Sequence, residues 1–114
     1  MENKELELAM AAAKTLDEKK GTDIVIIDIR NKASFADYFV LASGSNERLV
    51  GNLAEEVEKK LLENGIRPKS IEGDKRSGWI LMDYIDVIVN VLSVEARSKY
   101  SIETIWGDCE FITL

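Results

Sequence analysis

The chain has 114 residues, of which 46% are hydrophobic and 32% are charged, and its formal net charge is −6. This length fits one folded domain and is too short for two, so we predict a single domain over residues 1–114. The sequence has no histidine and a single cysteine, Cys109, which excludes an intramolecular disulfide, a cysteine-based structural metal site and any nucleophile that a histidine activates.

The excess of acidic residues restricts the partners that the chain can bind. Its 21 acidic and 15 basic side chains repel phosphate over most of the surface, so we expect no DNA binding, little direct RNA contact and a basic protein surface as partner. No apolar run approaches the roughly 20 residues of a membrane span, and residues 1–5 lack the pattern of a signal or transit peptide. We therefore predict a cytoplasmic protein that needs neither a membrane nor a metal or cofactor.

The first half of the chain predicts a helix, two strands and a second helix. Apolar residues recur at three- and four-residue spacings over residues 4–20, which is typical of an amphipathic helix. The β-branched run 23–28 lacks alternation and predicts a central strand covered on both faces, and residues 38–42 predict a second strand. A helix follows over about residues 46–64, with Ser45 as its N-cap.

The second half predicts more strands, followed by short helices. Residues 68–72 indicate a short edge strand, and residues 78–92 form two β-rich arms joined by a tight turn. Short helices follow to Tyr100 and over 102–106, and the tail 109–114 can add a strand. This order of elements predicts an α/β domain with a mixed β-sheet flanked by helices.

Apolar residues occupy both faces of the hairpin at residues 78–92. In its first arm Trp79, Leu81 and Asp83 share one face, and Tyr84 lies on the other with Ile80 and Met82. The hairpin must therefore be covered on both sides, or leave an apolar surface for a partner. One hypothesis places Trp79 in the core. The other makes Trp79 an anchor for a partner. Asp83 on the same face supports this second hypothesis, because a carboxylate rarely lies in a dry core.

Ser43-Gly44-Ser45 is the most enzyme-like feature of the sequence. Small residues between a strand and a helix let backbone N–H groups approach a phosphate, which predicts a nucleotide-binding or nucleotidyltransferase-like site as the alternative function. The same tripeptide is common where a strand ends before a capped helix. A transferase would also need two or three carboxylates that converge on a metal, and the sequence places none there. We therefore expect no catalytic residues.

Several segments together resemble the Iojap family of ribosomal silencing factors, from about Leu6 to Asp108. They include the Asp-Tyr-Phe-Val block at residues 37–40 and the Trp-Ile-Leu-Met-Asp-Tyr block at residues 79–84, with Asp86, Arg97, Tyr100 and Trp106 beyond them. The resemblance implies a nucleotidyltransferase-like fold that lacks the catalytic carboxylates. It also implies a homodimer that binds ribosomal protein fourteen of the large ribosomal subunit and sterically blocks joining of the small subunit, thereby repressing translation.

The resemblance also implies the partner-binding residues, which by position are Trp79, Leu81, Asp83, Tyr84 and Asp86. The chain departs from the family pattern beside them, with Ile85 in place of the usual Gly, Asn90 in place of a frequent His, and Leu92 in place of Phe. A β-branched residue resists a positive φ, so the turn at Ile85 must either differ from that of the family or store strain of about 1–3 kcal/mol.

Overall fold

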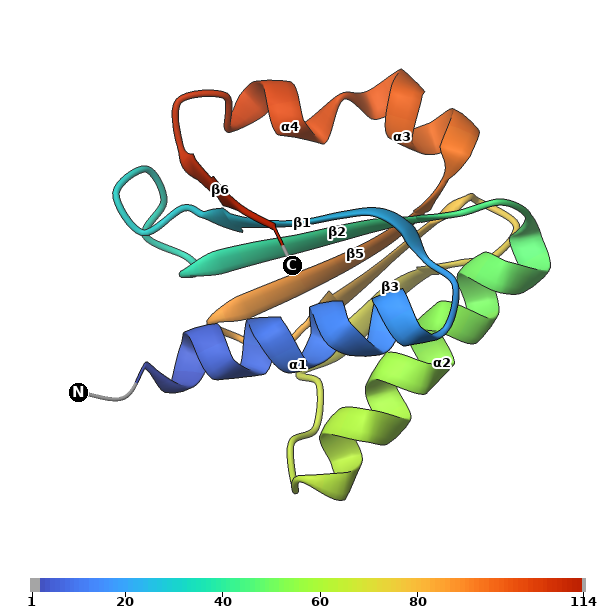
Figure 1. Ribbon diagram of the computed structural model, residues 1–114, viewed down its shortest axis with the longest axis horizontal. Coiled ribbons are helices and arrows are strands. Elements are labelled where there is room, and N and C mark those ends of the chain that lie inside the picture. Colours follow the sequence, from blue (N-terminus) through green and yellow to red (C-terminus); the bar gives the residue numbers. More distant parts are fainter. Residues whose placement is uncertain (1–2, 114) are drawn as a thin grey trace.

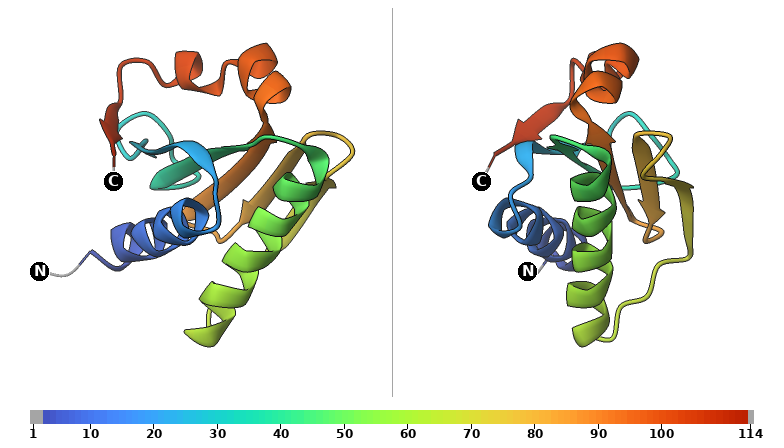
Figure 2. Two further views of the ribbon diagram at one scale, coloured as in Figure 1. Left: turned by 45° about the vertical axis from the view of Figure 1, so that its right-hand side comes forward. Right: turned by 90° about the vertical axis from the view of Figure 1, so that its right-hand side faces the viewer.

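The structure is a computed structural model that describes residues 3–113, and it forms three layers around one sheet (Figure 1). The six strands lie in the order β3-β4-β5-β2-β1-β6. α1 and α2 pack on one face of this sheet, and α3 and α4 lie over the other, as Figure 2 shows from two further sides. The elements are α1 (Lys4–Glu18), β1 (Thr22–Asp28), β2 (Tyr38–Gly44), α2 (Glu47–Glu63), β3 (Ser70–Asp74), β4 (Trp79–Asp83), β5 (Val87–Ser93), α3 (Val94–Tyr100), α4 (Ile102–Ile105) and β6 (Glu110–Ile112).

This architecture confirms the predicted α/β fold with a mixed sheet. β2 and β5 run parallel, and every other pair of neighbouring strands is antiparallel. β3 is an edge strand, as the nearby Pro68 suggested, and the C-terminal tail adds β6 at the opposite edge. No helix in residues 3–113 is long and apolar enough to cross a lipid bilayer.

Two of the local predictions are wrong in detail. The N-cap of α2 is Asn46 rather than Ser45, because β2 extends to Gly44 and the Asn46 side-chain oxygen accepts a hydrogen bond from the Leu49 N–H at 2.8 Å. The strand predicted at 23–28 lies inside the sheet, but only its second half is covered. Thr22 and Asp23 are exposed and the next two residues are half-buried. The register shifts between Thr22 and Val25, around Asp23, whose φ is +49°.

The sheet separates two apolar cores, which cover opposite faces of the β4–β5 hairpin. The α1–α2 core contains, among others, Ala13, Leu16, Val40, Leu53, Val57, Ile80, Met82 and Val89. The α3–α4 core contains Ile27, Ile29, Leu41, Ile88, Leu92, Ala96 and Ile102. The hairpin alternates between these cores along both arms, as its sequence predicts.

Candidate functional site

The candidate surface, which we define as Trp79, Leu81, Asp83 and Asp86, lies on the hairpin face that α3 and α4 cover only in part. Trp79, Leu81 and Asp83 are all half-buried, whereas the β4 residues between them are buried. In the register of the sheet Leu81 pairs with Asn90, and Asp83 pairs with Ile88 of β5. The predicted grouping of these three side chains on one face is therefore confirmed.

Trp79 is neither a free surface residue nor a fully buried one. Its indole Nε1–H donates to the side-chain oxygen of Asn90 at 3.0 Å, and its ring lies 4.9 Å from that of Tyr100 in α3. Asn90 is completely buried, and its amide nitrogen donates to the Ile88 carbonyl at 3.4 Å. Trp79 is therefore intermediate in burial between the two hypotheses: it packs against the α3–α4 core and remains partly exposed, and its role as an anchor stays a prediction.

The tip of the hairpin turns through Ile85. The Asp83 carboxylate accepts a hydrogen bond from the Ile85 N–H at 2.7 Å, so the Asp83 side chain stabilises the turn that follows it. Ile85 has a φ of +75° and is 61% exposed. The sequence left two outcomes for this β-branched residue, a different turn or a strained one. The turn keeps the positive φ and stores the strain.

Asp86 lies at an acidic edge of the candidate surface. Its carbonyl oxygen accepts hydrogen bonds from the Asp37 N–H at 2.7 Å and the Tyr38 N–H at 3.2 Å, while its side chain is exposed. Burial and the neighbouring Asp86 carboxylate raise the pKa of Asp37. Within residues 3–113 neither Asp83 nor Asp86 forms a salt bridge, so no basic side chain of this part of the chain neutralises their charges.

Tyr84 is separated from the other predicted contact residues by the sheet itself. Its side chain is only 6% exposed and packs in the α1–α2 core. Its hydroxyl has no hydrogen-bond partner among the described residues, and burial, followed by the charge of Glu58, raises its pKa to about 12. The Tyr84 side chain therefore packs in the core on the opposite face of the sheet and does not line the candidate surface.

An aromatic cluster that the sequence did not predict continues the candidate surface across the sheet. Ile88 pairs with Phe39 of β2, so Asp83, Ile88 and Phe39 form one row on this face. The Phe39 ring lies 5.5 Å from Trp106, and the 58%-exposed Phe35 lies 6.2 Å from both. The available signal was an aromatic residue, Phe35, within the otherwise polar loop that precedes β2.

Comparison with known proteins shows which family the chain matches. A family model described as "Ribosomal silencing factor during starvation" matches residues 2–114. A ribosomal silencing factor of Bacillus subtilis is 36% identical over 103 residues, which are 90% of this chain and 87% of that protein. A ribosomal silencing factor of Halalkalibacterium halodurans is 33% identical over 108 residues, which are 95% of this chain and 92% of that protein.

The chain belongs to the ribosomal silencing factor family.

The solved structures agree with this assignment. A crystal structure of a Chromobacterium violaceum protein superposes with a TM-score of 0.87 at 34% identity, covering 94% of this chain and 88% of that one. Proteins named Iojap are also similar, including a chloroplast protein of Zea mays that is 26% identical. The family name describes a regulatory factor rather than an enzyme.

In this member of the family, the first residue of the predicted enzyme-like turn forms a hydrogen bond within the protein. Ser43 is buried within β2, and its hydroxyl oxygen accepts a hydrogen bond from Arg97 at 3.0 Å. Arg97 also donates twice to the Glu103 carboxylate, at 2.9 and 3.1 Å. Burial alone would raise the pKa of Glu103, but the hydrogen bonds and charge of Arg97 outweigh it and lower that pKa. The Ser43 hydroxyl therefore accepts its hydrogen bond from a guanidinium group that is itself held by the Glu103 carboxylate.

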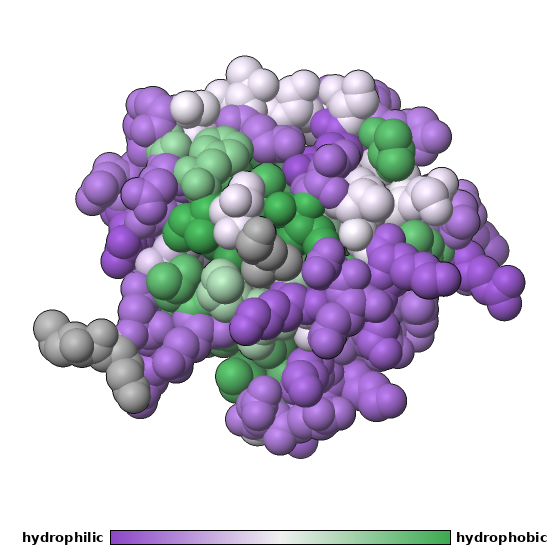
Figure 3. Space-filling view, in the orientation of Figure 1, coloured by the Kyte–Doolittle hydropathy of each residue, from purple (hydrophilic) through white to green (hydrophobic). Residues whose placement is uncertain are grey.

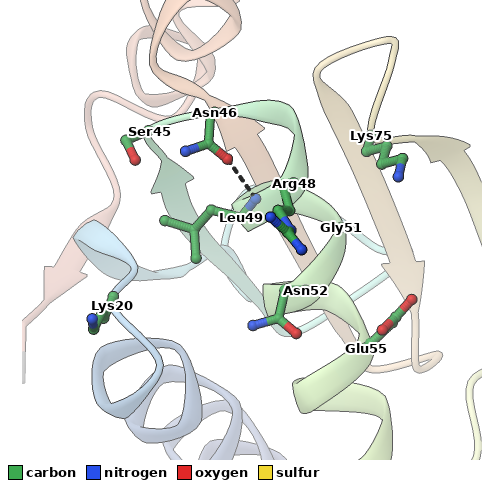
Figure 4. A pocket seen from close by; sticks show the side chains of 9 residues that line it. All are labelled: Lys20, Ser45, Asn46, Arg48, Leu49, Gly51, Asn52, Glu55 and Lys75. Carbon is green, nitrogen blue, oxygen red and sulfur yellow. Dashed lines mark hydrogen bonds between the residues drawn. The ribbon is translucent and has the colours of Figure 1, made fainter.

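A hollow of about 660 Å³ lies beside Ser45, at the start of α2 (Figure 4). Lys20, Arg48 and Lys75 reach it from three different segments, and Glu55 is the one carboxylate in its described lining. Among residues 3–113, no three acidic or cysteine side chains lie close enough to hold a metal ion. The arrangement lacks the converging carboxylates that metal-dependent nucleotidyl transfer requires.

Proposed function

We propose that this chain represses translation by binding the large ribosomal subunit and sterically blocking the joining of the small subunit, without catalysis and in the cytoplasm. Its membership of the ribosomal silencing factor family is the observation that carries this proposal. Obstruction of a subunit interface needs only a bound body of sufficient size. The described residues extend over 38 × 33 × 24 Å, which is large enough to separate two surfaces that must touch.

The docking site in this proposal is the candidate surface, and the partner is ribosomal protein fourteen. A half-buried aromatic residue, an aliphatic residue and an acidic rim are the features of an interface that pairs an apolar anchor with a basic partner. The net charge of −6 favours such a partner and speeds its encounter by electrostatic steering. Raising the ionic strength is then expected to slow association more than it speeds dissociation.

A homodimer forms the second part of the proposal. Apolar atoms gather in the middle of the molecular face shown in Figure 3, between α1 and the edge formed by β1 and β6. Partly buried apolar residues of these elements pack on the α1–α2 core, namely Leu6, Met10, Ile24 and Ile112. A second copy could cover this surface. Sedimentation velocity of the chain and of a Met10→Lys variant tests the dimer, and a wild-type monomer at all concentrations would exclude it.

Co-sedimentation with isolated ribosomal subunits tests the main proposal. We expect the chain to pellet with large subunits and not with small ones. When it is added before mixing, we expect fewer joined ribosomes on a sucrose gradient. Leu81→Glu should abolish both effects, because it places a charge on the candidate surface. Leu62→Glu is the matched control, since Leu62 is exposed on α2 in the opposite layer.

The enzymatic alternative has its own test. Calorimetric titration of the chain with ATP and Mg²⁺ is expected to give no saturable heat in the micromolar range. Saturable binding that disappears in Arg48→Ala would support a nucleotide site in the hollow beside Ser45, and it would count against a purely steric mechanism.

A further inference from the structure

Ile85 adopts a backbone conformation that its side chain disfavours. Four non-glycine residues in the described chain have a positive φ, and the other three are Lys20, Asp23 and Ser101. Those three are polar and unbranched at Cβ, whereas Ile85 carries two carbon substituents there. The left-handed region crowds Cβ against the backbone, and branching makes this crowding worse. Ile85 is therefore the unusual member of this set.

The turn around Ile85 is rigidly held. The Asp83 carboxylate accepts the Ile85 N–H at 2.7 Å, and the Asp86 N–H donates to the Tyr84 carbonyl at 3.0 Å. The Tyr84 N–H donates to the Val87 carbonyl at 2.9 Å, which closes the hairpin beneath the tip. Since β4 and β5 pair on both sides of the turn, residue 85 cannot relax without breaking these bonds.

The Ile85 side chain does not offset this cost within the protein. It is 61% exposed and belongs to neither the α1–α2 core nor the α3–α4 core. Strained residues of this kind concentrate at ligand clamps and binding sites, where the surrounding structure holds them in place. The position of Ile85 fits such a role, because it stands directly between two residues of the candidate surface, Asp83 and Asp86.

We propose that Ile85 is a specificity-determining contact residue, whose side chain enters an apolar pocket bordered by basic side chains on the ribosomal partner. This inference rests on the proposed function and deepens it by stating the chemistry of the partner's surface. The apolar side chain requires a dry pocket. The carboxylates of Asp83 and Asp86 on either side form no salt bridge among residues 3–113, and they require lysine or arginine at the rim of that pocket.

The test compares folding and binding in the same variants, using purified large ribosomal subunits as the probe. Ile85→Gly removes the side chain and the strain together, so the midpoint of thermal unfolding is expected to rise by about 4 °C. Binding to large subunits is expected to weaken about tenfold, which corresponds to about 1.4 kcal/mol. Ile85→Asn tolerates the left-handed backbone but is polar, and we expect it to bind as weakly as Ile85→Gly.

Leu62→Ala is the matched control, because it truncates an exposed apolar side chain in the opposite layer, and its binding should stay within twofold of wild type. A more stable protein that binds less tightly is the expected signature of Ile85→Gly. Binding of Ile85→Gly at the wild-type affinity overturns the inference while leaving the proposed function intact. Failure of the wild-type chain itself to bind large subunits overturns both.

Discussion

The two faces of the β4–β5 hairpin come from the same fifteen residues but are covered to very different extents. The face toward α1 and α2 is closed, and Ile80, Met82 and Val89 on it are buried. The face toward α3 and α4 buries Ile88 and Leu92 of β5 but leaves Trp79 and Leu81 of β4 half-exposed. The difference follows from the lengths of the covering helices, which are 15 and 17 residues on one side and 7 and 4 on the other.

This comparison explains how one hairpin can serve both stability and recognition. Apolar burial on the closed face stabilises the fold. The open face can therefore keep partly exposed aromatic and acidic side chains at little cost in stability. Asn90 joins the two roles, because it lies at the buried centre of the sheet and fixes the orientation of Trp79. Substitutions on opposite faces should therefore have separable effects on folding and on binding.

The largest expected effect is on the closed face. Met82→Ala removes a completely buried side chain and is expected to lower the free energy of unfolding by about 2–5 kcal/mol. Its sequence neighbour Leu81 lies on the open face, so Leu81→Ala should cost less than about 1.5 kcal/mol and weaken subunit binding instead. Urea unfolding of both variants measures the contrast. Equal losses of stability would show that the two faces are covered alike.

Trp79→Ala is expected to affect both properties. The substitution leaves the Asn90 oxygen buried without its partner, at a cost of about 1–3 kcal/mol, and it also removes the contact with Tyr100. Binding to large subunits should fall further, since a partly exposed side chain of the candidate surface is lost. A double-mutant cycle of Trp79→Phe and Asn90→Ala isolates the hydrogen bond, because phenylalanine keeps the ring and loses the donor. Strictly additive effects would mean that the Nε1–H bond contributes nothing.

Much of this fold follows from local sequence patterns. The three- and four-residue spacings predicted α1 and α2 to within about two residues, and two-residue alternation assigned the hairpin faces correctly. The N-cap of α2 was displaced by one residue, because Ser45 and Asn46 can both accept the same kind of hydrogen bond and only the end of β2 decides between them.

Contacts between distant segments could not be predicted in this way. The parallel pairing of β2 with β5 joins residues about fifty positions apart, and no local pattern encodes it. The same limit applies to the site. The contact of Tyr100 with Trp79, whose rings are tilted by 44°, depends on where α3 crosses the sheet, as does the bond between Arg97 and Ser43. Asn90 did leave a signal, as a polar residue in an apolar strand on the face of Trp79.

A smaller effect is expected from pH, through the ion pair that ties α3 to α4. The pKa of Glu103 is lowered in the folded state, so its contribution to stability is complete above its ordinary pKa of 4.5 and is lost as the pH falls through the folded value. Glu103→Gln should therefore be less stable than wild type at pH 7, and the difference should shrink below about pH 4.5. Urea unfolding across this range measures it. A difference that is constant with pH would exclude the ion pair as its cause.

The smallest effect, and the sharpest test of the comparison, is expected from Tyr84→Phe. The substitution removes a buried hydroxyl that has no partner among the described residues, so the free energy of unfolding should stay the same or rise by up to about 1 kcal/mol. Subunit binding should not change, because the side chain lies on the closed face. A loss of binding without a loss of stability would instead place the Tyr84 hydroxyl in contact with the partner.

Alkaline pH gives an independent check on the same residue. The pKa of Tyr84 is raised from 10.0 to about 12 in the folded state, so between these values the unfolded chain releases its proton first. Deprotonation then favours unfolding, and the stability of the wild type should fall as the pH rises above 10. The Tyr84→Phe variant should lose less stability over this range. Parallel alkaline curves for the two proteins would mean that Tyr84 is open to water, and that the closed face is less complete than its neighbours Ile80 and Met82 indicate.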